Sequence, residues 1–354
     1  MRSLPKVVAC LAAFTLVGTA CSSQDQGAGP APSSSVANVT TPEQKSINIG
    51  YNVTLDPTFV PDLASYQCLE DKFSVKADVH TIKGAPASIT SLIAGELDIT
   101  LSTLGAGINA VKEGQDIVAF VPSASAPYFT LMAPATVKKW TDLKGMTFGS
   151  TSPSDSSYYT TALLLEKHGL SVDDVKWVTV QGSAARAQAM VGGKIDAGQV
   201  TVTEMLEVEK SSSMRKWAAV GEHFPDLIFN AYWVTRDYLK KNPKTLSAFV
   251  TCLMTEHREA YDEKLFATKA KSVLPDAYEA ETIKKAYQTL IDMNIWDPNE
   301  ARWTKSIGDS TIKTMAKYEA IEAFVPFDEW ATTDLVDQVR KDLGAFKTPS
   351  PSSK

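Results

Sequence analysis

The sequence predicts an α/β fold with two lobes of the same plan and a ligand cleft between them. Two segments, residues 84–98 and 182–196, align without a gap at an offset of 98. Both begin with glycine, end with aspartate and carry a glycine three residues before that aspartate. A looser match at nearly the same offset joins residues 47–50 to residues 146–149. We interpret these matches as a duplicated unit, and a chance alignment of small residues is the alternative.

Each copy of the repeat predicts a short helix followed by a strand. Apolar residues recur at helical spacing in both copies, as Ile89, Leu92 and Ile93 and as Ala187, Met190 and Val191. The glycine that follows suits the left-handed backbone found at many helix ends. Apolar stretches then predict strands over 97–101 and 195–200. Because open α/β sheets bind ligands beyond the carboxyl ends of their strands, two facing lobes would form a cleft.

The order of the remaining segments predicts the lobe boundaries. Lobe one is predicted to contain residues 46–124, which hold several strand-like stretches and the first repeat. The chain is predicted to return to this lobe after residue 235, which adds residues 236–346. A small polar break at 122–127 predicts the first crossing, so lobe two covers 125–235 and includes a strand over 228–234. From 242 to 346 the pattern is helical, and residues 347–354 read as a disordered polar tail.

The N-terminus predicts export and a lipid anchor. Arg2 and Lys6 flank an apolar run that is too short to span a bilayer, which is typical of a signal peptide over 1–20. The small residues before Cys21 resemble a bacterial lipoprotein signal, which implies that this cysteine is lipidated. An ordinary signal peptide is the alternative. Residues 21–45 are rich in Ser, Pro, Gly and Ala and predict a flexible tether.

Charge and cysteine content narrow the class of protein. Removing the 20-residue signal, with its two basic residues, would take the formal net charge from −6 to about −8. An acidic chain without a basic run argues against nucleic acid as a partner, but backbone amides could still bind an anion. Outside the signal and Cys21, only Cys68 and Cys252 remain, as one disulfide or as two separate buried thiols.

Hydroxyl and amide side chains near predicted strand ends are the candidate ligand-binding residues. Ser156, Ser157 and Tyr158 open a helix, whose free amides suit an acid group, although Ser and Asp at such positions also cap helices. Other candidates follow the first strand, the repeat strands and the crossings, namely Tyr51, Asn52, Ser102, Thr103, Ser123, Gln199, Thr201 and Tyr232. Tyr51, Tyr128, Tyr158 and Tyr232 could stack on a planar ligand or pack in the core. Arg186 could pair with an anion, but an exposed arginine is more often solvated, so we leave it outside this set.

Catalysis is not predicted. The four histidines, at positions 80, 168, 223 and 257, are scattered and fall in no metal-spaced motif. No nucleophile elbow or phosphate loop is present. We therefore expect a protein that is not an enzyme and holds neither a cofactor nor a metal.

The order and spacing of several short motifs resemble the solute-binding proteins of ABC importers, and among them the sulfonate, taurine, nitrate and thiamine-precursor (NMT1/THI5-like) group. The motifs lie at residues 47–51, 94–98, 142–145, 156–159, 193–196 and 236–239, with Asn242-Pro243 after them. Departures fall in two loops that line the site in the group. Residues 104–106 lack a frequent proline, and residues 201–204 replace a Trp-x-Pro pattern, so substrate identity does not carry over.

The resemblance implies a fold, a function and partners. It implies a type II periplasmic-binding-protein-like fold, with a mixed sheet and flanking helices in each lobe. The expected function is to capture a small organic anion by hinge closure. This anion would be a sulfonate or a carboxylate, and the tyrosines suggest that it is aromatic. The partners would be this small molecule and the ABC permease. The lipid anchor would hold the protein, as a monomer, on the extracytoplasmic side of the membrane. A sensory binding protein and a binder of a thiamine-precursor pyrimidine are the alternatives.

Overall fold

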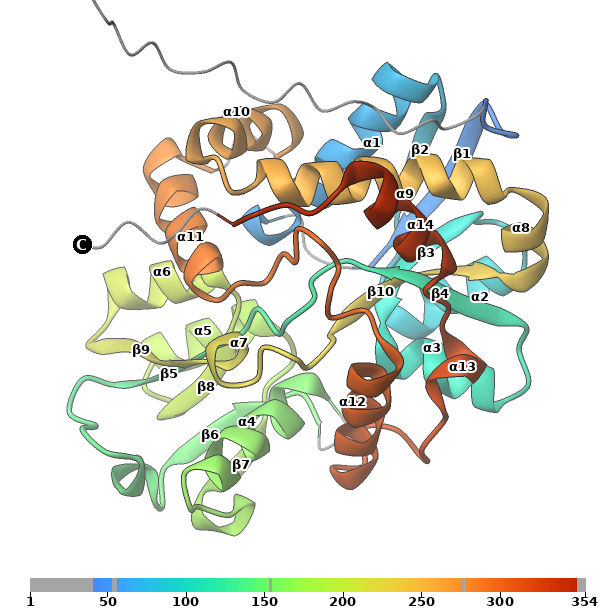
Figure 1. Cartoon of the computed structure of the whole chain (residues 1–354). Coiled ribbons are helices and arrows are strands. Elements are labelled where there is room, and N and C mark those ends of the chain that lie inside the picture. The colour runs from blue at the N-terminus through green and yellow to red at the C-terminus, as the bar shows by residue number, and fades with distance from the viewer. Residues whose placement is uncertain (1–40, 53–55, 153–154, 275–277, 349–354) are drawn as a thin grey trace, which may run out of the picture. The chain divides into compact units, whose positions relative to one another are not determined.

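Two mixed five-stranded sheets organise the computed structural model, which describes residues 41–52, 56–152, 155–274 and 278–348 (Figure 1). The first sheet has the order β2 (Lys76–Thr81), β1 (Ser46–Tyr51), β3 (Ile99–Thr103), β10 (Asn230–Thr235) and β4 (Ile117–Pro122). The second has the order β7 (Lys176–Thr179), β6 (Thr147–Ser150), β8 (Ala197–Val200), β5 (Thr130–Pro134) and β9 (Met214–Ala219). In each sheet, the fourth strand in this order is antiparallel to both of its neighbours.

Helices flank both sheets, as expected for this fold class. Around the strands of the first sheet lie α1 (Val60–Phe73), α2 (Ala85–Ile93) and α3 (Leu104–Lys112), with the short η1 (Pro57–Phe59). The second sheet carries α4 (Ser156–Lys167), α5 (Ser183–Val191), α6 (Val202–Ser211) and α7 (Val220–His223), with the short η2 (Trp140–Leu143) and η3 (Val172–Asp174). α6 and β9 lie within 202–219, where no element was predicted.

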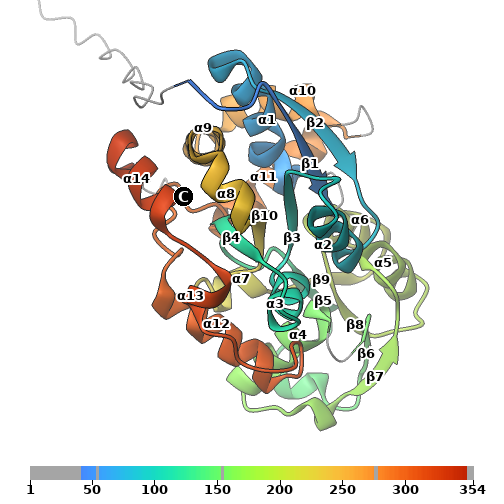
Figure 2. The ribbon, with the colours of Figure 1, turned by 90° about the vertical axis from the view of Figure 1, so that its right-hand side faces the viewer.

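The C-terminal third of the chain is helical, as predicted. It holds α8 (Arg236–Lys241), α9 (Pro243–Glu259), α10 (Glu263–Val273), α11 (Ala280–Asp292), α12 (Lys305–Lys317), α13 (Phe327–Trp330) and α14 (Asp334–Leu343). Helices α13 and α14 pack against β4, and Figure 2 shows α13 beside α12 and α14 beside α9. Helix α9 packs against α1, whereas α11 reaches α6 of the second sheet's helices.

The strand that returns from the second sheet belongs to the first. We predicted this strand within 125–235, but β10 pairs with β3 and with β4, so the boundary of lobe two lies before β10 rather than after it. The reason is a symmetry between the two crossings. β5 follows the first crossing and β10 follows the second, and each enters its new sheet as the antiparallel strand.

The aspartates that end the two repeats have the same structural role. Asp98 Oδ2 accepts the N–H of Asn48 at 2.7 Å, and Asp196 Oδ2 accepts the N–H of Thr147 at 2.8 Å. Each carboxylate thus satisfies a backbone donor of the neighbouring strand, because β1 lies beside β3 and β6 beside β8. The repeated aspartate is explained by folding and needs no ligand.

The repeated glycines also have structural causes. Gly95 and Gly193 follow the ends of α2 and α5 with φ of 75° and 64°, the left-handed conformation that the sequence predicted. In the upstream match, a β carbon on Gly50 would lie 2.3 Å from Leu97, and one on Gly149 would lie 2.7 Å from Ile195. The strands therefore need glycine to admit the apolar residue of the adjacent repeat.

A disulfide and the first described residues hold α9 in place. Cys68 of α1 and Cys252 of α9 form a disulfide with an S–S distance of 2.00 Å. At the start of α9, Glu43 accepts the N–H groups of Lys244 at 3.2 Å and Thr245 at 2.8 Å. The end of the predicted tether, at 41–45, therefore includes a residue bound to the folded part of the chain.

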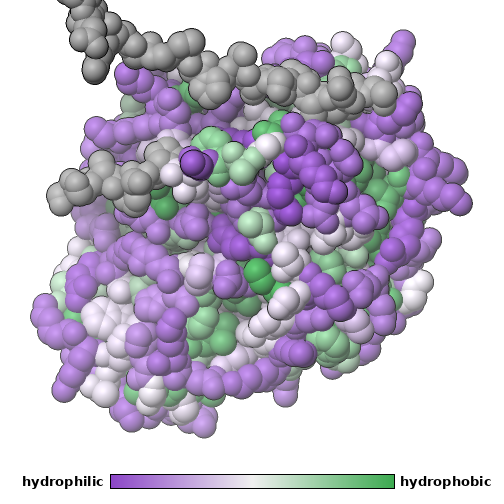
Figure 3. All heavy atoms as spheres, in the orientation of Figure 1, coloured by the Kyte–Doolittle hydropathy of each residue, from purple (hydrophilic) through white to green (hydrophobic). Residues whose placement is uncertain are grey.

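Several N- and C-terminal predictions fall outside the described residues. They are the signal peptide over 1–20, the lipidated Cys21, the tether as far as residue 40 and the tail from 349. Within the residues that the structure does describe, no helix is long and apolar enough to cross a membrane. The face shown in Figure 3 is mostly hydrophilic, with apolar residues in smaller patches among the polar ones.

Candidate ligand-binding site

A cavity of about 220 Å³ lies where residues that follow strands of both sheets meet the two crossings. It is lined by Asn52, Asp56, Phe59 and Thr103 from the first sheet's side, by Tyr128, Phe129 and Phe229 from the crossings, and by Thr151, Asp155, Ser156, Gly182, Ser183, Arg186 and Thr201 from the second sheet's side. Asn52, Thr103, Thr151 and Thr201 lie at or just after the carboxyl ends of β1, β3, β6 and β8. This is where open α/β sheets bind ligands.

Aromatic rings form one wall of the cavity. The ring centroids of Tyr128, Phe129 and Phe229 lie 5.0–5.4 Å apart, and Phe59 packs edge-on against Tyr128 at 5.4 Å. All four rings are buried. Such edge-to-face packing fixes the rings, so the wall offers a firm apolar surface to a ligand. Asn230 adds to this order by donating to the Tyr128 hydroxyl at 3.3 Å.

Arg186 is a buried cation that lines the cavity on the second sheet's side. Its side chain is only 3% exposed. Nε donates to the Gln199 carbonyl at 2.7 Å, and Nη1 donates to Thr151 Oγ1 at 3.1 Å and to the Val180 carbonyl at 3.3 Å. Among the described residues, no carboxylate lies within ion-pair distance of it. Burial lowers the pKa of Arg186, while Asp155 and Glu204 farther away act to raise it.

The start of α5 adds free donors beside Arg186. Gly182 precedes α5 with φ of 77° and has no side chain to cap the helix, and among the described residues no other side chain bonds to the first N–H groups of α5. The equivalent start of α2 is closed. With its amide oriented to satisfy both polar atoms, Asn52 accepts the N–H of Ala85 at 2.9 Å and donates to the Leu101 carbonyl at 3.1 Å. An open helix start carries a partial positive charge, so α5 and Arg186 together favour an acid group.

Two carboxylates also line the cavity. Asp56 caps η1 by accepting the N–H of Thr58 at 2.8 Å and is 1% exposed. Burial raises its pKa to about 6, with Glu204 adding to the rise. Asp155 caps α4 by accepting the N–H of Ser157 at 2.9 Å. The α4 start, which the sequence singled out for an acid group, is thus already occupied by a carboxylate.

Besides Tyr128, four of the predicted residues line the cavity. They are Asn52, Thr103, Ser156 and Thr201. Thr103 ends β3, Thr201 precedes α6 and Ser156 is the first residue of α4. The backbone N–H of Thr201 donates to Ser183 Oγ at 2.9 Å, which joins two lining residues.

Three predicted polar residues are buried beside the cavity and bond to the protein instead. Ser102 Oγ accepts from Ser88 at 3.1 Å. Gln199 Oε1 accepts from Thr160 at 2.8 Å. Ser157 Oγ donates to Asp155 at 2.5 Å, so its hydroxyl supports the cap of α4.

The remaining predicted residues also lie away from the cavity lining. Tyr232 is fully buried and donates to Asp62 at 2.8 Å, and Tyr51 accepts from Thr81 at 3.0 Å beside another groove. Tyr158 packs on Trp177, with ring centroids 4.4 Å apart. Ser123 is fully buried in the first crossing, where its N–H donates to the Asn230 carbonyl at 3.2 Å.

Asp56 and the aromatic wall apart from Tyr128 were not among the predicted residues, and Arg186 was left outside the set. For Arg186 a signal was available. It aligns with Ser88 in the other repeat, and both side chains are buried. A charged residue that replaces a small one at a buried, repeated position indicates a function specific to one lobe.

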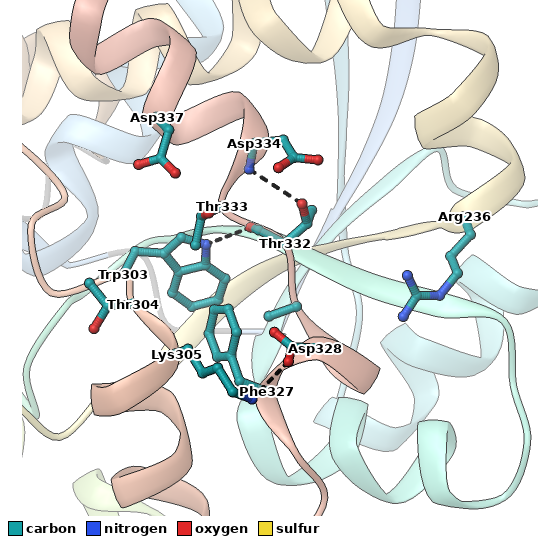
Figure 4. A pocket seen from close by; sticks show the side chains of 11 residues that line it. Arg236, Trp303, Thr304, Lys305, Phe327, Asp328, Thr332, Thr333, Asp334 and Asp337 are labelled. Carbon is teal, nitrogen blue, oxygen red and sulfur yellow. Dashed lines mark hydrogen bonds and ion pairs between the residues drawn. The ribbon is translucent and has the colours of Figure 1, made fainter.

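A second hollow of about 450 Å³ lies among the C-terminal helices (Figure 4). Most of its charged residues bond to neighbours. Lys305 pairs with Asp328 at 2.8 Å, Arg236 donates to the Glu329 carbonyl at 2.7 Å and Asp337 pairs with Arg340 at 2.8 Å. It contains no residue of either repeat, so we do not regard it as the ligand site despite its larger volume.

Comparison with known proteins gives one consistent picture. Residues 77–263 match a family described as NMT1/THI5 like. A protein of Brucella abortus (strain 2308), named only as a binding protein, is 25% identical over 248 residues, which are 69% of this chain and 76% of that protein.

Solved structures share the fold at low identity. A ligand-binding component of an ABC-type import system from Staphylococcus aureus has a TM-score of 0.69 and 13% identity over 84% of this chain and 99% of that one. A periplasmic sulfonate-binding protein of Methylobacillus flagellatus has a TM-score of 0.67 and 15% identity over 85% and 95%. The nitrate-binding protein of Synechocystis PCC 6803 has a TM-score of 0.63 and 12% identity over 85% and 90%. The predicted periplasmic-binding-protein-like fold is confirmed.

Proposed function

Because the chain belongs to the NMT1/THI5-like family, we propose that it is an extracytoplasmic solute-binding protein of an ABC importer. It would capture a small molecule with an acid group in the 220 Å³ cavity and deliver it to the permease. The observation that carries this proposal is Arg186, a buried cation that faces the cavity beside an open helix start without a carboxylate partner among the described residues. A buried charge without a counter-ion is costly, and a bound anion would supply one.

The similar structures support an acid group on the ligand. Their names give sulfonate and nitrate as the molecules that two of them bind. The aromatic wall of Phe59, Tyr128, Phe129 and Phe229 adds an apolar surface, which suits an organic acid better than an inorganic ion. The cavity is slightly smaller than those that hold drug-sized molecules, so the ligand would be small.

Binding would be coupled to closure of the two lobes. The sheets are joined by two crossings, and both contribute rings to the cavity wall. The C-terminal helices also reach the second sheet's helices, where Lys317 of α12 pairs with Glu166 of α4 at 2.7 Å. Hinge closure about the crossings would bury the ligand between the lobes and form the surface that the permease recognises.

The N-terminal sequence supports the location. Export through the signal peptide, lipidation at Cys21 and a tether from that residue would hold a monomer at the extracytoplasmic face of the membrane. A Cys21→Ala variant should lose radiolabelled fatty acid and should leave the membrane fraction. If this variant keeps the label, Cys21 is not the lipidated residue, and the proposed ligand binding is unaffected by that result.

The proposed function is tested by thermal unfolding against a ligand panel. The panel holds alkyl sulfonates, aromatic and aliphatic carboxylates, nitrate, bicarbonate and an aminopyrimidine that represents thiamine precursors. A ligand at 100 times its dissociation constant should stabilise the protein by about 2.7 kcal/mol, which raises the melting temperature measurably. Protein refolded to remove any bound molecule should respond to at least one acid. A response to none would contradict the proposal.

A genetic test separates import from sensing. Deletion of the gene should abolish uptake of the radiolabelled acid that the panel identifies. Normal uptake with loss of a transcriptional response to that acid would instead support a sensory binding protein.

A further inference from the structure

Resting on the proposed function, we infer that the ligand is a zwitterion, with its acid group at Arg186 and a protonated amine between Asp56 and Glu204. The inference starts from the charges around the cavity. The described lining residues include one cation, Arg186, and two carboxylates, Asp56 and Asp155. Glu204 adds a third carboxylate next to Thr201. A simple anion would therefore enter a site with an excess of negative charge, which disfavours it.

Asp56 lacks a cation of its own. It is 1% exposed, and no lysine, arginine or histidine among the described residues lies within ion-pair distance of it. The Thr58 N–H donates to its carboxylate at 2.8 Å, and the hydroxyls of Thr58 and Thr201 also act to lower its pKa. None of these donors carries a charge. Buried carboxylates are normally paired, and the elevated pKa of Asp56 reflects this missing partner.

Glu204 approaches Asp56 from the other lobe. It lies in the first turn of α6, which packs against η1, the helix that Asp56 caps. Its carboxylate accepts the hydroxyl of Thr201, a lining residue, and it raises the pKa of Asp56. The pKa of the Tyr278 hydroxyl is raised to about 12, mainly by burial and then by the negative charges of Asp56 and Glu204. Tyr278 therefore also lies near both carboxylates. The two carboxylates thus belong to elements that pack together across the lobes, and each disfavours the charge of the other unless a positive group lies near both.

The positive group cannot be Arg186. The guanidinium is held in place by the Gln199 and Val180 carbonyls and by Thr151, and it lies outside ion-pair distance of Asp155 and Glu204. The acid-binding and amine-binding groups are therefore separate parts of one small cavity. A molecule that carries both an acid and an amine would satisfy both, whereas a sulfonate or nitrate alone would leave Asp56 and Glu204 unpaired.

Matched pairs of acids test the inference on the full-length chain, purified in detergent and freed of bound molecules. One series holds amino acids whose amine and acid lie at increasing separation, from glycine through β-alanine and γ-aminobutyrate to ε-aminocaproate, with homotaurine and para-aminomethylbenzoate. The other holds the same acids without the amine. Titration calorimetry should find an amino member that binds roughly 30-fold more tightly than its partner, because a charge-assisted hydrogen bond is gained.

Variants then assign the amine. Asp56→Asn keeps an acceptor for Thr58 but removes the charge, so it should abolish the preference for the amino member without weakening the amine-free acid. Glu204→Gln should also reduce the ratio by which the amino member binds more tightly than its amine-free partner. Glu207→Gln, on the same helix but exposed, serves as the matched control and should keep the wild-type preference. Melting temperatures of the free variants check that each has folded.

Three results would overturn the inference. If amino and amine-free acids bind equally while Arg186→Gln weakens both, the proposed function stands and the zwitterion fails. If an amine without an acid group binds most tightly and Arg186→Gln leaves it unaffected, the acid end is wrong. If no acid of either series binds, the proposed function fails and the inference fails with it.

Discussion

One difference between the two repeats places a charged side chain at a buried position. Arg186 and Ser88 occupy the same position in the first turns of α5 and α2. Ser88 bonds to Ser102 and the Ala85 carbonyl and so closes its side of the structure, whereas Arg186 brings a permanent charge to the cavity. The Nε and Nη1 of Arg186 donate to protein oxygens, and its Nη2 makes no bond to the described residues, so Nη2 can donate to an acid group while the rest of the guanidinium stays fixed.

Removing that charge should weaken ligand binding more than it weakens the fold. For Arg186→Gln we expect the affinity for the acid identified by the panel to fall by about 2 kcal/mol, roughly 30-fold. Calorimetry measures this loss. Arg236→Gln is the control, because this arginine lines the second hollow and should leave affinity unchanged. Equal affinities of the two variants would exclude Arg186 from the site.

A buried pair of charges stabilises the first crossing. His257 Nδ1 lies 2.6 Å from Glu300 Oε1, both side chains are fully buried, and Ser125 of the crossing donates to the other oxygen of Glu300 at 3.1 Å. Burial alone would lower the pKa of His257, but the Glu300 carboxylate outweighs burial and raises it. The charged pair is thus formed only in the folded state.

We expect His257→Gln to destabilise the protein by about 3 kcal/mol, because it leaves a buried carboxylate without its partner. The sign with pH follows from the raised pKa. The stabilisation is complete below the unfolded pKa near 6.5 and is lost as pH rises through the folded value. Urea unfolding should therefore show a larger difference from wild type at pH 6 than at pH 9. The exposed His80→Gln should show none, and a difference that grows with pH would contradict the assignment.

Among the elements, α9 has an unusual cap. Its own Asn242 makes no side-chain capping bond, and the donors at its start are taken by Glu43, about 200 residues earlier. Burial alone would raise the pKa of Glu43, but the N–H groups of Thr245 and Lys244 outweigh it and lower the pKa. A negative charge at a helix start also complements the helix dipole.

For Glu43→Ala we expect a loss of about 1 kcal/mol or less, since the carboxylate is exposed and screened. Because the folded pKa is lowered, the stabilisation is present above the unfolded pKa near 4.5 and is lost as pH falls through the folded value. Chemical unfolding at pH 7 and pH 3 measures both. The control is Glu96→Ala, which changes an exposed glutamate with no side-chain bond to the described residues and should unfold like wild type. If Glu43→Ala also unfolds like wild type at both pH values, Glu43 does not stabilise the start of α9.

The sequence predicted the elements of the repeats because each is fixed locally. Apolar spacing identifies α2 and α5, and Gly95 and Gly193 end them through a backbone conformation that glycine favours. The placement of β10 could not be predicted in this way, because its apolar pattern fits either sheet and only pairing with β3 and β4 decides.

The candidate site was predicted in part for a similar reason. Strand ends directed attention to Asn52, Thr103 and Thr201, and these three residues line the cavity. Strand ends do not tell whether a hydroxyl points to a ligand or to a neighbour, as Ser102 and Gln199 show. Asp56 is positioned by tertiary packing against α6 and carried no sequence signal of its own.

For the whole molecule, the disulfide should contribute substantially to stability. It closes a loop with a sequence separation of 184 residues, and such loops restrict the unfolded chain most. Reduction, or the Cys68→Ala and Cys252→Ala double variant, should lower the stability by roughly 3–5 kcal/mol and the melting temperature with it. Ligand affinity should not change, because neither cysteine lines the cavity. An unchanged melting temperature after complete reduction would contradict this expectation.

The place of β10 in the first sheet bears on how the chain is assembled as it leaves the ribosome. The strands of the second sheet are contiguous from Thr130 to Ala219, so all of them emerge before β10 does. The first sheet begins with Ser46 but lacks the strand between β3 and β4 until Thr235 has emerged, and its disulfide must wait for Cys252. The half of the protein that is synthesised first is therefore completed last, and β3 and β4 keep exposed edges during this interval. Such edges invite pairing with other chains, so the growing chain would be most prone to aggregation before its final third has arrived.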